Sequence, residues 1–301
     1  MTVVARAPAK VNVHLGVGPL RPDGYHELHT VYLAVSLFDT VTVRAADGLS
    51  VSVTGVDADD VPTDRRNLVW RAAELLADHA GVPSDAAIEI EKRIPAAAGL
   101  AGGSADAAAA LIALDALWGT HASRGDLDLL AARLGSDVPF SLHGGVALGG
   151  GHGEQLSPVL ARTPSHWVLG IAGQGLSTPA VYAELDRLRE IGPVRGDTGL
   201  ETADPVIAAL RSGPASALAD ALTNDLQAAA LSLRPELGRA MRAATDAGAL
   251  AALVSGSGPT VAALAADEHG AIRLAAELAG AGVFRTVRAV FGPVPGARLL
   301  G

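Results

Sequence analysis

The chain has 301 residues, of which 49% are hydrophobic and 18% charged, so it can bury a sizeable core and is not a disordered segment. Its net charge of −9 opposes a nucleic-acid-binding surface, which needs a basic face. It contains no cysteine, which excludes disulfides and thiolate metal sites and fits the cytoplasm. No apolar run has the length of a membrane span, and the first ten residues lack the pattern of a signal peptide.

The first half of the chain predicts strands interleaved with helices. The stretch VVARAPAKVNVHL alternates over residues 3–15, which places Lys10, Asn12 and His14 on one face of a strand. Prolines and the pair Asp23-Gly24 predict a loop over residues 16–28. Strands are expected over residues 31–45, 49–55 and 86–94, and helices over residues 67–79, 104–118 and 127–134.

The second half begins with a predicted strand at residues 166–173 and a helix at 179–190. A loop over residues 192–205 precedes helices at 206–222, 225–232 and 234–247. Two strands around a glycine turn are expected over 251–266, then a helix near 271–281 and a last strand at 284–292. The order lacks steady β-α-β alternation, which favours an α+β fold, and the glycines near residue 150 suggest two domains, 1–155 and 156–301.

Lysine is rare in this chain. Only Lys10 and Lys92 are lysines among 23 basic residues, and both lie in segments marked by glycine or proline. A lysine ammonium is compact and can approach a reacting oxygen more closely than the broad guanidinium of arginine. We therefore treat Lys10 as a candidate functional residue, whereas Lys92 is as well explained by chance.

The stretch KRIPAAAGLAGGSADAAAA, residues 92–110, places three glycines and a serine before an alanine-rich helical segment. It has neither the GK[ST] of a Walker loop nor the GxGxxG of a dinucleotide site. Glycine lets backbone N–H groups approach an anion, and a helix start carries positive partial charge. We predict a phosphate-binding loop here with Ser104 at the N-cap. The alternative is an ordinary glycine-rich turn between a strand and a helix.

Two further stretches contain candidate polar groups. In LGSDVPFSLHGG, Asp137 is either the N-cap of a short helix or a general base that accepts a hydroxyl proton. A carboxylate beside a lysine such as Lys10 can prepare an alcohol to attack a γ-phosphoryl group. In VSGSGPT, residues 255–258 form a second glycine turn, which taken alone indicates only a tight hairpin.

Taken together, these stretches resemble the three motifs of the GHMP small-molecule kinases: APAKVN, PAAAGLAGGSADAA and SGSGPT. The resemblance extends from Ala7 to about Leu264. RPDGYHEL, GSDVPF and STPAVY are similar to the members of this family whose acceptor is a cytidine diphosphate-linked polyol. The resemblance implies a two-domain α+β fold, with an N-terminal domain like domain 2 of ribosomal protein S5 and a ferredoxin-like C-terminal domain.

The resemblance also implies the catalytic and ATP-binding residues. Lys10 and Asp137 match the catalytic lysine and the general base. The residues that match the ATP-binding segment are Lys92, Pro95, Ala96, Ala97, Ala98, Gly99, Leu100, Ala101, Gly102, Gly103 and Ser104. The third motif, close to the phosphates, matches Ser255, Gly256, Ser257 and Gly258. ATP is the implied co-substrate and Mg²⁺ is expected with it, although the sequence does not identify the metal ligands.

Four residues match the acceptor site: Asn12, Tyr25, His26 and Tyr182. Tyr25 and Tyr182 would enclose the cytosine ring from two sides, and His26 would form a hydrogen bond to its edge. Side-chain packing is the alternative explanation for each tyrosine. The implied partners are therefore two small molecules, ATP and a cytidine diphosphate-linked polyol, with no nucleic acid and no membrane.

The sequence departs from the family pattern at two positions. It reads GLAGGSAD where many relatives have GLGGGSSD, so Ala101 must adopt a backbone angle that alanine tolerates, and Ala105 removes a hydroxyl. The segment TNDLQ at residues 223–227 also resembles a family segment, and helix capping is its simplest role. Three other functions stay open: a kinase for homoserine or mevalonate, a catalytically silent nucleotide-binding protein, and a nucleic-acid-binding module.

Overall fold

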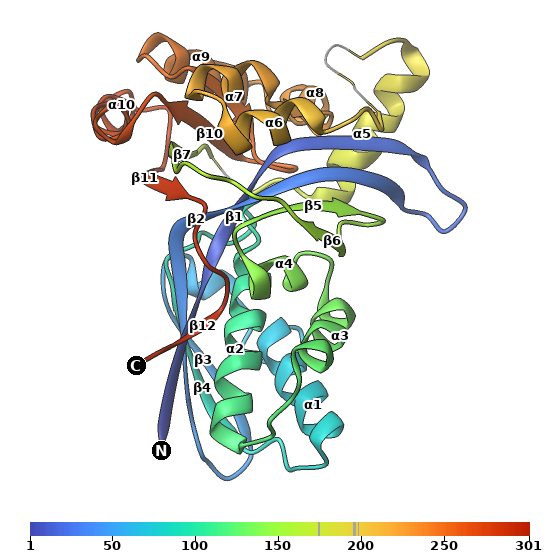
Figure 1. Cartoon of the computed structure of the whole chain (residues 1–301), viewed down its shortest axis with the longest axis vertical. Coiled ribbons are helices and arrows are strands. Elements are labelled where there is room, and N and C mark those ends of the chain that lie inside the picture. The colour runs from blue at the N-terminus through green and yellow to red at the C-terminus, as the bar shows by residue number, and fades with distance from the viewer. Residues whose placement is uncertain (174, 195–196, 198) are drawn as a thin grey trace.

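The computed structural model describes residues 1–173, 175–194, 197 and 199–301. These residues form a mixed eight-stranded sheet, built mostly by the first half of the chain, and a four-stranded antiparallel sheet built by the second half. In Figure 1 most of the larger sheet and its helices occupy the lower part, while the far end of the β1–β2 hairpin extends to the upper right, under α5. The smaller sheet lies above with its own helices. The predicted α+β class is confirmed.

The larger sheet is built around two 19-residue strands, β1 (Thr2–Leu20) and β2 (His26–Arg44), which pair antiparallel. Its other strands are β3 (Leu49–Gly55), β4 (Ala86–Lys92), β5 (Val146–Gly150), β6 (Gln155–Pro158), β8 (Thr223–Asn224) and β12 (Arg298–Leu300). The main path runs β12-β1-β2-β4-β3, with β5 on β2, β6 on β5 and β8 on β1. The last strand of the chain thus returns to the first sheet. The sequence patterns did not predict the short strands β6, β8 and β12.

Helices α1 (Leu68–Ala80), α2 (Gly102–Trp118), α3 (Arg124–Leu134) and α4 (Val138–His143) pack beside the larger sheet, and a 3₁₀ turn spans Ala58–Asp60. Asn67 caps α1 by accepting the N–H of Val69, and Gly81 ends it in a left-handed conformation. Helix α2 is apolar on almost every side, and such a helix is buried in the core. It therefore holds the preceding glycine loop on a rigid support.

The smaller sheet has the strand order β11-β7-β10-β9. Its strands are β7 (Ser165–Ile171), β9 (Ala251–Val254), β10 (Thr260–Ala265) and β11 (Thr286–Gly292). Its helices are α5 (Thr178–Ile191), α6 (Asp204–Ser212), α7 (Ala215–Ala221), α8 (Leu226–Leu233), α9 (Glu236–Asp246) and α10 (Glu268–Gly280). Helices α5 to α9 all lie between β7 and β9, and α10 lies between β10 and β11. The four strands of this sheet and their helical connections therefore follow the β-α-β-β-α-β pattern of a ferredoxin-like unit, as the resemblance implied.

The helix predicted over residues 206–222 is divided in the structure. It ends at Ser212 and restarts at Ala215, because Pro214 has no N–H to continue the helical hydrogen bonding. The loop predicted over residues 192–205 lies partly outside the described residues.

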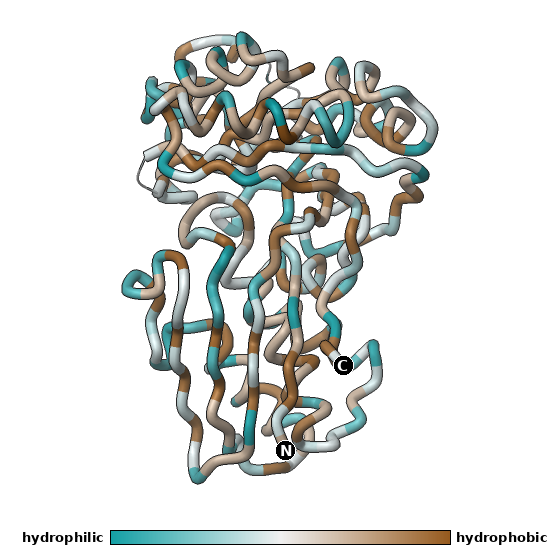
Figure 2. Tube along the Cα trace, turned by 90° about the vertical axis from the view of Figure 1, so that its left-hand side faces the viewer, coloured by the Kyte–Doolittle hydropathy of each residue, from teal (hydrophilic) through white to brown (hydrophobic). Residues whose placement is uncertain are grey.

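The core is mainly aliphatic, as expected from an aromatic content of 3%. Figure 2 shows hydrophobic residues recurring along the strands of the larger sheet and along the helices beside them. Trp167 and Phe140 are the largest of the fully buried side chains. Among the residues that the structure describes, no helix is both long and apolar enough to cross a membrane.

Candidate active site

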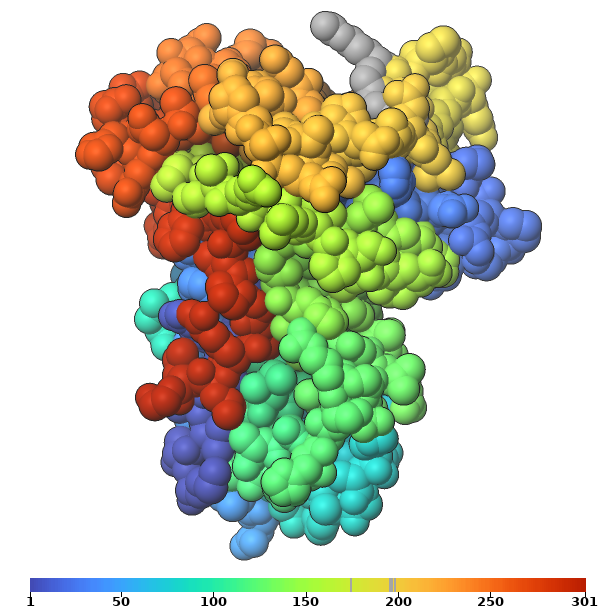
Figure 3. Space-filling view, viewed as in Figure 1, coloured from blue at the N-terminus to red at the C-terminus, as the bar shows by residue number. Residues whose placement is uncertain are grey.

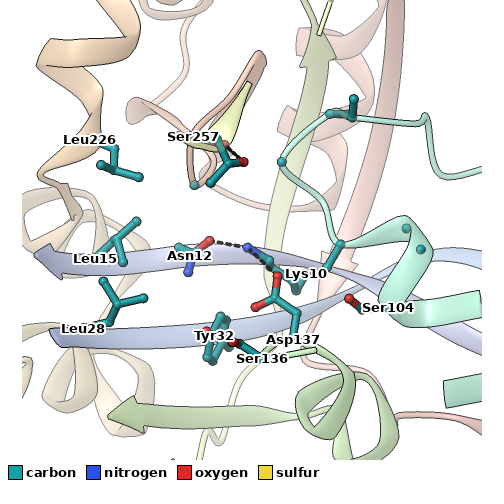
Figure 4. Close-up of a pocket in the computed structure, with 18 of the residues that line it drawn as sticks. Lys10, Asn12, Leu15, Leu28, Tyr32, Ser104, Ser136, Asp137, Leu226 and Ser257 are labelled. Carbon is teal, nitrogen blue, oxygen red and sulfur yellow. Dashed lines mark hydrogen bonds and ion pairs between the residues drawn. The ribbon is translucent and has the colours of Figure 1, made fainter. Parts of the chain in front are cut away.

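A cavity of about 420 Å³ lies where β1, the loop before α2 and parts of the second half of the chain meet (Figure 4). Predicted site residues from four separate segments line it: Lys10 and Asn12, Asp137, Tyr182, and Gly256 and Ser257. Seven residues of the predicted phosphate loop also line it: Ala97, Ala98, Gly99, Ala101, Gly102, Gly103 and Ser104. Residues separated by up to 247 positions in sequence therefore share one cavity.

The predicted catalytic pair is close together in this cavity. Nζ of Lys10 lies 3.7 Å from Oδ2 of Asp137 and donates a hydrogen bond of 2.6 Å to Oδ1 of Asn12. Figure 4 shows the Lys10 side chain between these two partners. Asn12 is held in turn, because its Nδ2 donates to the Thr30 hydroxyl at 2.8 Å. Lys10 is buried whereas 30% of the Asp137 side chain is exposed, so the carboxylate faces the open cavity.

Asp137 occupies the N-cap position of α4 but does not cap it. Its side chain accepts no hydrogen bond from the first turn of that helix. Pro139, early in this helix, reduces the number of N–H groups that need a cap. The carboxylate is therefore available for other chemistry, which removes the capping alternative raised by the sequence.

Tyr32, on β2, is a site residue that the sequence analysis did not identify. It lines the cavity beside Asp137, and its ring stacks on Phe140 with 4.9 Å between centroids. Burial, together with the charge of Asp137 and a hydrogen bond to it, raises the pKa of the Tyr32 hydroxyl well above its ordinary value. Tyr32 is therefore a neutral donor that helps to orient the Asp137 carboxylate.

The predicted phosphate loop, Pro95–Ser104, connects β4 to α2. The helix begins at Gly102 with Ala101 at the N-cap, so Ser104 lies in the first turn and the prediction of Ser104 as N-cap was wrong. The N–H groups of Gly102 and Gly103 are among those that a helix start leaves without intrahelical partners. The Ser104 hydroxyl lines the cavity. Pro95, Ala96 and Leu100 do not line it.

Two alanines of this loop have a left-handed backbone. Ala97 has φ 49° and Ala101 has φ 58°, a region that favours glycine. Ala101 stands where many relatives have glycine, so this departure imposes local strain. Backbone packing fixes the loop nevertheless, since the Leu100 carbonyl accepts the N–H of Lys10 at 3.2 Å.

The turn Ser255–Gly258, which we call the third-motif turn, lies against the phosphate loop. The Ser255 hydroxyl donates to the Gly99 carbonyl at 3.2 Å. Ser257, which lines the cavity, shares a hydrogen bond of 2.9 Å with the Thr178 hydroxyl of α5. This turn therefore connects the phosphate loop with α5, so its role goes beyond that of a tight hairpin.

Lys92 does not reach the cavity. Its side chain is 2% exposed, and its ammonium group donates to Asp106 at 2.7 Å and forms a second short contact with Asp39. Burial lowers the pKa of Lys92, but the two carboxylates outweigh it and the net pKa is raised, so the side chain stays charged. Asp39 also accepts the N–H groups of Arg93 and Ile94. The structure thus places Lys92 in a buried ion-pair cluster beneath the phosphate loop.

The four predicted acceptor residues fall into two groups. Asn12 and Tyr182 line the cavity, whereas Tyr25 and His26 lie where the β1–β2 hairpin turns. Figure 3 shows this hairpin (blue) projecting from the body beside α5 (yellow). The His26 ring lies 5.1 Å from that of Tyr182, and its Nε2 shares a hydrogen bond of 2.9 Å with Asp186. The buried His26 side chain therefore supports Tyr182.

Tyr25 has a partner that the sequence analysis did not identify. Its ring lies 4.8 Å from that of His152, and His152 lines the cavity. Tyr25 is 61% exposed, so it can receive a further ring.

The β1–β2 hairpin is longer than predicted. A loop was expected over residues 16–28, but β1 continues to Leu20 and β2 begins at His26. Pro19 is accommodated at a shift in strand register, where ladder hydrogen bonds are interrupted.

His14, the third polar residue on this face of β1, does not line the cavity. Its Nδ1 shares a hydrogen bond of 2.7 Å with the Thr223 hydroxyl, and its Nε2 is buried without a partner. Burial, together with the nearby His29, lowers the pKa of His14 from 6.5 to about 4. The folded protein therefore holds a neutral imidazole at pH values where the unfolded chain is protonated.

This difference predicts a loss of stability in acid. The imidazole is half protonated at pH 6.5 in the unfolded chain but only at about pH 4 in the folded protein, so stability falls as the pH drops between these values. From about pH 7 to about pH 4.5, the wild type should lose roughly 2–3 kcal/mol more unfolding free energy than His14→Gln. Urea unfolding of both proteins at the two pH values measures this, and equal losses would contradict it.

Comparison with known proteins identifies the family. Residues 67–145 match the GHMP kinases N terminal domain and residues 206–283 match the GHMP kinases C terminal model. The chain is 60% identical to 4-diphosphocytidyl-2-C-methyl-D-erythritol kinase of Rhodococcus jostii, across 99% of this chain and 95% of that protein. It is 58% identical to the protein of the same name from Mycobacterium tuberculosis, across 99% of this chain and 93% of that protein.

A crystal structure of 4-(cytidine 5'-diphospho)-2C-methyl-D-erythritol kinase is similar throughout, with a TM-score of 0.76 and 36% identity. The match covers 97% of this chain and 99% of that one. Sequence, fold and the three motifs agree, and kinase activity implies ATP as co-substrate. The chain belongs to the GHMP kinase family.

Proposed function

We propose that this chain is a 4-diphosphocytidyl-2-C-methyl-D-erythritol kinase, which transfers the γ-phosphoryl group of ATP to the 2-hydroxyl of its acceptor in the non-mevalonate route to isoprenoids. The observation that carries the proposal is the Lys10–Asp137 pair, with 3.7 Å between Nζ and Oδ2, in a cavity lined by the phosphate loop and by Tyr182. The relatives at 58–60% identity carry that name.

In this reaction Asp137 is the general base. Its carboxylate accepts the proton of the acceptor hydroxyl, whose oxygen forms a bond to the γ-phosphorus while the bond from that phosphorus to the β–γ bridging oxygen breaks, leaving ADP. Lys10 stabilises the negative charge that develops on the transferred group. The acceptor alcohol is tertiary and hindered, so its orientation by Asn12 and the cavity walls matters more than nucleophile strength.

The ATP phosphates would bind at the cavity-lining part of the phosphate loop, facing the start of α2. An acidic protein needs such local positive potential, and the N–H groups of Gly102 and Gly103 with the helix dipole supply it. Ser104 would add a hydroxyl, and the third-motif turn would close the site from the other side. Lys92 has no part in this binding, because its buried ammonium group forms ion pairs with Asp39 and Asp106.

Mg²⁺ would enter with ATP and offset the charge of its phosphates. Among the described residues, no group of three or more histidine, aspartate or glutamate side chains could hold a metal ion by itself. The Ser104 hydroxyl, in the first turn of α2, is one of the oxygen donors that line the cavity. A single protein oxygen of this kind suits Mg²⁺, which commonly binds to one or two protein oxygens and keeps phosphate and water ligands.

The acceptor would lie toward the β1–β2 hairpin, with its cytosine between Tyr25 and Tyr182 and its hydroxyl at Asp137. His26 would contribute through its backbone and its Nδ1, because its Nε2 shares a hydrogen bond with Asp186.

The division into domains 1–155 and 156–301 remains part of the proposal, supported by the two family models that match on either side of residue 155. A cytoplasmic location stays a prediction.

The test is ADP release with Mg-ATP and four acceptors: the cytidyl-diphospho-methylerythritol, free methylerythritol phosphate, homoserine and mevalonate. Turnover with the first alone is expected. Turnover with homoserine or mevalonate would keep the family chemistry but overturn the cytosine site. If none of the four reacts although ATP binds, the catalytically silent alternative becomes the better account.

Tyr25→Ala is expected to raise KM for the cytidyl acceptor by about tenfold, because base stacking on an aromatic ring contributes roughly 1–3 kcal/mol. KM for ATP should stay within about twofold, since Tyr25 lies at the hairpin turn and does not line the cavity with the phosphate loop. Tyr25→Phe retains the ring and should keep the acceptor KM near that of the wild type. Steady-state kinetics with each substrate varied in turn measure this, and equal effects on both substrates would contradict the stacking role.

A further inference from the structure

The segment TNDLQ at residues 223–227 has a structural role that its resemblance to a family segment did not reveal. Thr223 and Asn224 form β8, which pairs in parallel with His14 and Leu15 of β1. The segment is thereby fixed to the strand that carries Lys10. The Asp225 carboxylate adds a second attachment, because it accepts the N–H of Val17 at 2.8 Å.

The Asn224 side chain uses its donors and its acceptor at once. Nδ2 donates to the carbonyl oxygens of Val254, at 2.7 Å, and Gly256, at 2.8 Å. Oδ1 accepts the N–H of Leu226 at 2.9 Å. The residue is 7% exposed, and two carbonyl acceptors on one side fix which end of the amide is the NH₂ group. The Asn224 side chain therefore holds the third-motif turn by hydrogen bonds to backbone carbonyls in and next to the turn.

The position of this turn matters to the predicted chemistry. A Cβ on Gly256 would lie 3.3 Å from Oδ1 of Asn12 and 3.6 Å from Nζ of Lys10. The turn also contacts the Gly99 carbonyl through the Ser255 hydroxyl. The third-motif turn thus touches both the Lys10–Asn12 pair and the phosphate loop, so a shift of the turn would disturb both.

We propose that Asn224 is a positioning residue for phosphoryl transfer, which holds the third-motif turn in the place where ATP phosphates meet Lys10. This inference rests on the proposed function of the cavity and explains why the segment contains an amide at this position. An aspartate has the same shape but lacks the two N–H donors that the carbonyls of Val254 and Gly256 require. Helix capping, the simplest reading of the segment, accounts only for the bond to Leu226.

Asn224→Asp tests the proposal. The variant keeps an oxygen for the Leu226 N–H but places a carboxylate oxygen against two carbonyl oxygens, which should displace the turn. KM for ATP should rise by about tenfold or more and kcat should fall, because small displacements of groups that orient a reaction are costly. KM for the cytidyl acceptor should stay within about twofold.

Two further variants make the result specific. Gln227→Glu is a matched control, since Gln227 accepts the N–H of Val254 through Oε1 at 3.0 Å and glutamate keeps that acceptor. Its KM for ATP should stay within about twofold of the wild type. Asn224→Ala removes the donors without adding charge, so it should shift KM for ATP in the same direction and remains informative if Asn224→Asp does not fold.

The comparison of KM with kcat separates positioning from folding. A partly unfolded preparation has a lower apparent kcat but an unchanged KM, so unchanged KM for ATP in both Asn224 variants would overturn the proposal. If the wild type does not turn over the cytidyl acceptor, the proposed function fails, but calorimetric ATP binding still tests Asn224. The expected result there is about tenfold weaker binding to Asn224→Ala, and equal affinity would contradict it.

Discussion

Replacement of Asp137 by asparagine is expected to lower kcat by roughly 10²- to 10⁴-fold, the range found when a general base is lost. Asparagine has almost the same shape, and it can still accept the hydrogen bond from Tyr32. It cannot take up the proton of the acceptor hydroxyl. ATP binding should remain largely intact, because the phosphate loop contacts Lys10 and the third-motif turn without involving Asp137.

The control for this experiment is Asp128→Asn. Asp128 lies on α3, pairs with Nε2 of His143 at 2.9 Å and does not line the cavity. Its loss should leave kcat within about twofold. Single-turnover rates and calorimetric ATP affinities of both variants measure the difference, and an unchanged rate in Asp137→Asn would remove Asp137 from the mechanism.

Gly99→Ala is expected to have the largest effect on stability among single substitutions in the phosphate loop. A Cβ at this position would lie 2.4 Å from the Ser255 carbonyl oxygen and 3.0 Å from that of Gly258, and the residue has φ +75°. Backbone strain and overpacking together should lower the free energy of unfolding by roughly 2–5 kcal/mol. ATP affinity should fall at least tenfold, because the loop and the third-motif turn must separate.

Gly103→Ala is the matched control within the same loop. A Cβ on Gly103 would meet only Cδ1 of Leu68, at 3.9 Å, which is an ordinary contact. Gly103 lies inside α2, where alanine is favoured over glycine by about 0.5–1 kcal/mol. Urea unfolding should therefore show Gly103→Ala at least as stable as the wild type. Equal stability of Gly99→Ala and Gly103→Ala would contradict the close packing of the two glycine turns.

The local elements could be predicted because their signals are local. Alternation, β-branched residues and caps place β3, β4 and α1 to α3 within three residues of their observed bounds. The errors arise where distant contacts outweigh local preference. Pro19 and Pro22 predicted a loop, but the pairing of β1 with β2 extends the strand past Pro19. Helix α2 begins at Gly102, two residues before the predicted start at Ser104, so Ala101 is the N-cap, with a left-handed backbone.

The candidate site was predictable in composition but not in arrangement. Motifs identified Lys10, Asp137 and the phosphate loop, while their proximity depends on how α4 packs against β1. Tyr32 was missed because a tyrosine within an apolar strand has the pattern of an ordinary core residue. Lys92 was assigned to ATP because it precedes the loop, whereas its partners Asp39 and Asp106 are 53 and 14 residues away in sequence.

The central claim is that this cavity transfers a phosphoryl group from ATP to an alcohol of an intact cytidine diphosphate-linked polyol. ³¹P NMR of a reaction containing Mg-ATP and the cytidyl-diphospho-methylerythritol measures this directly. The expected result is one new phosphomonoester signal that grows with ADP, while the diphosphate signals of the acceptor remain and Asp137→Asn produces neither change. Inorganic phosphate in place of the phosphomonoester, or loss of the acceptor diphosphate, would contradict the account.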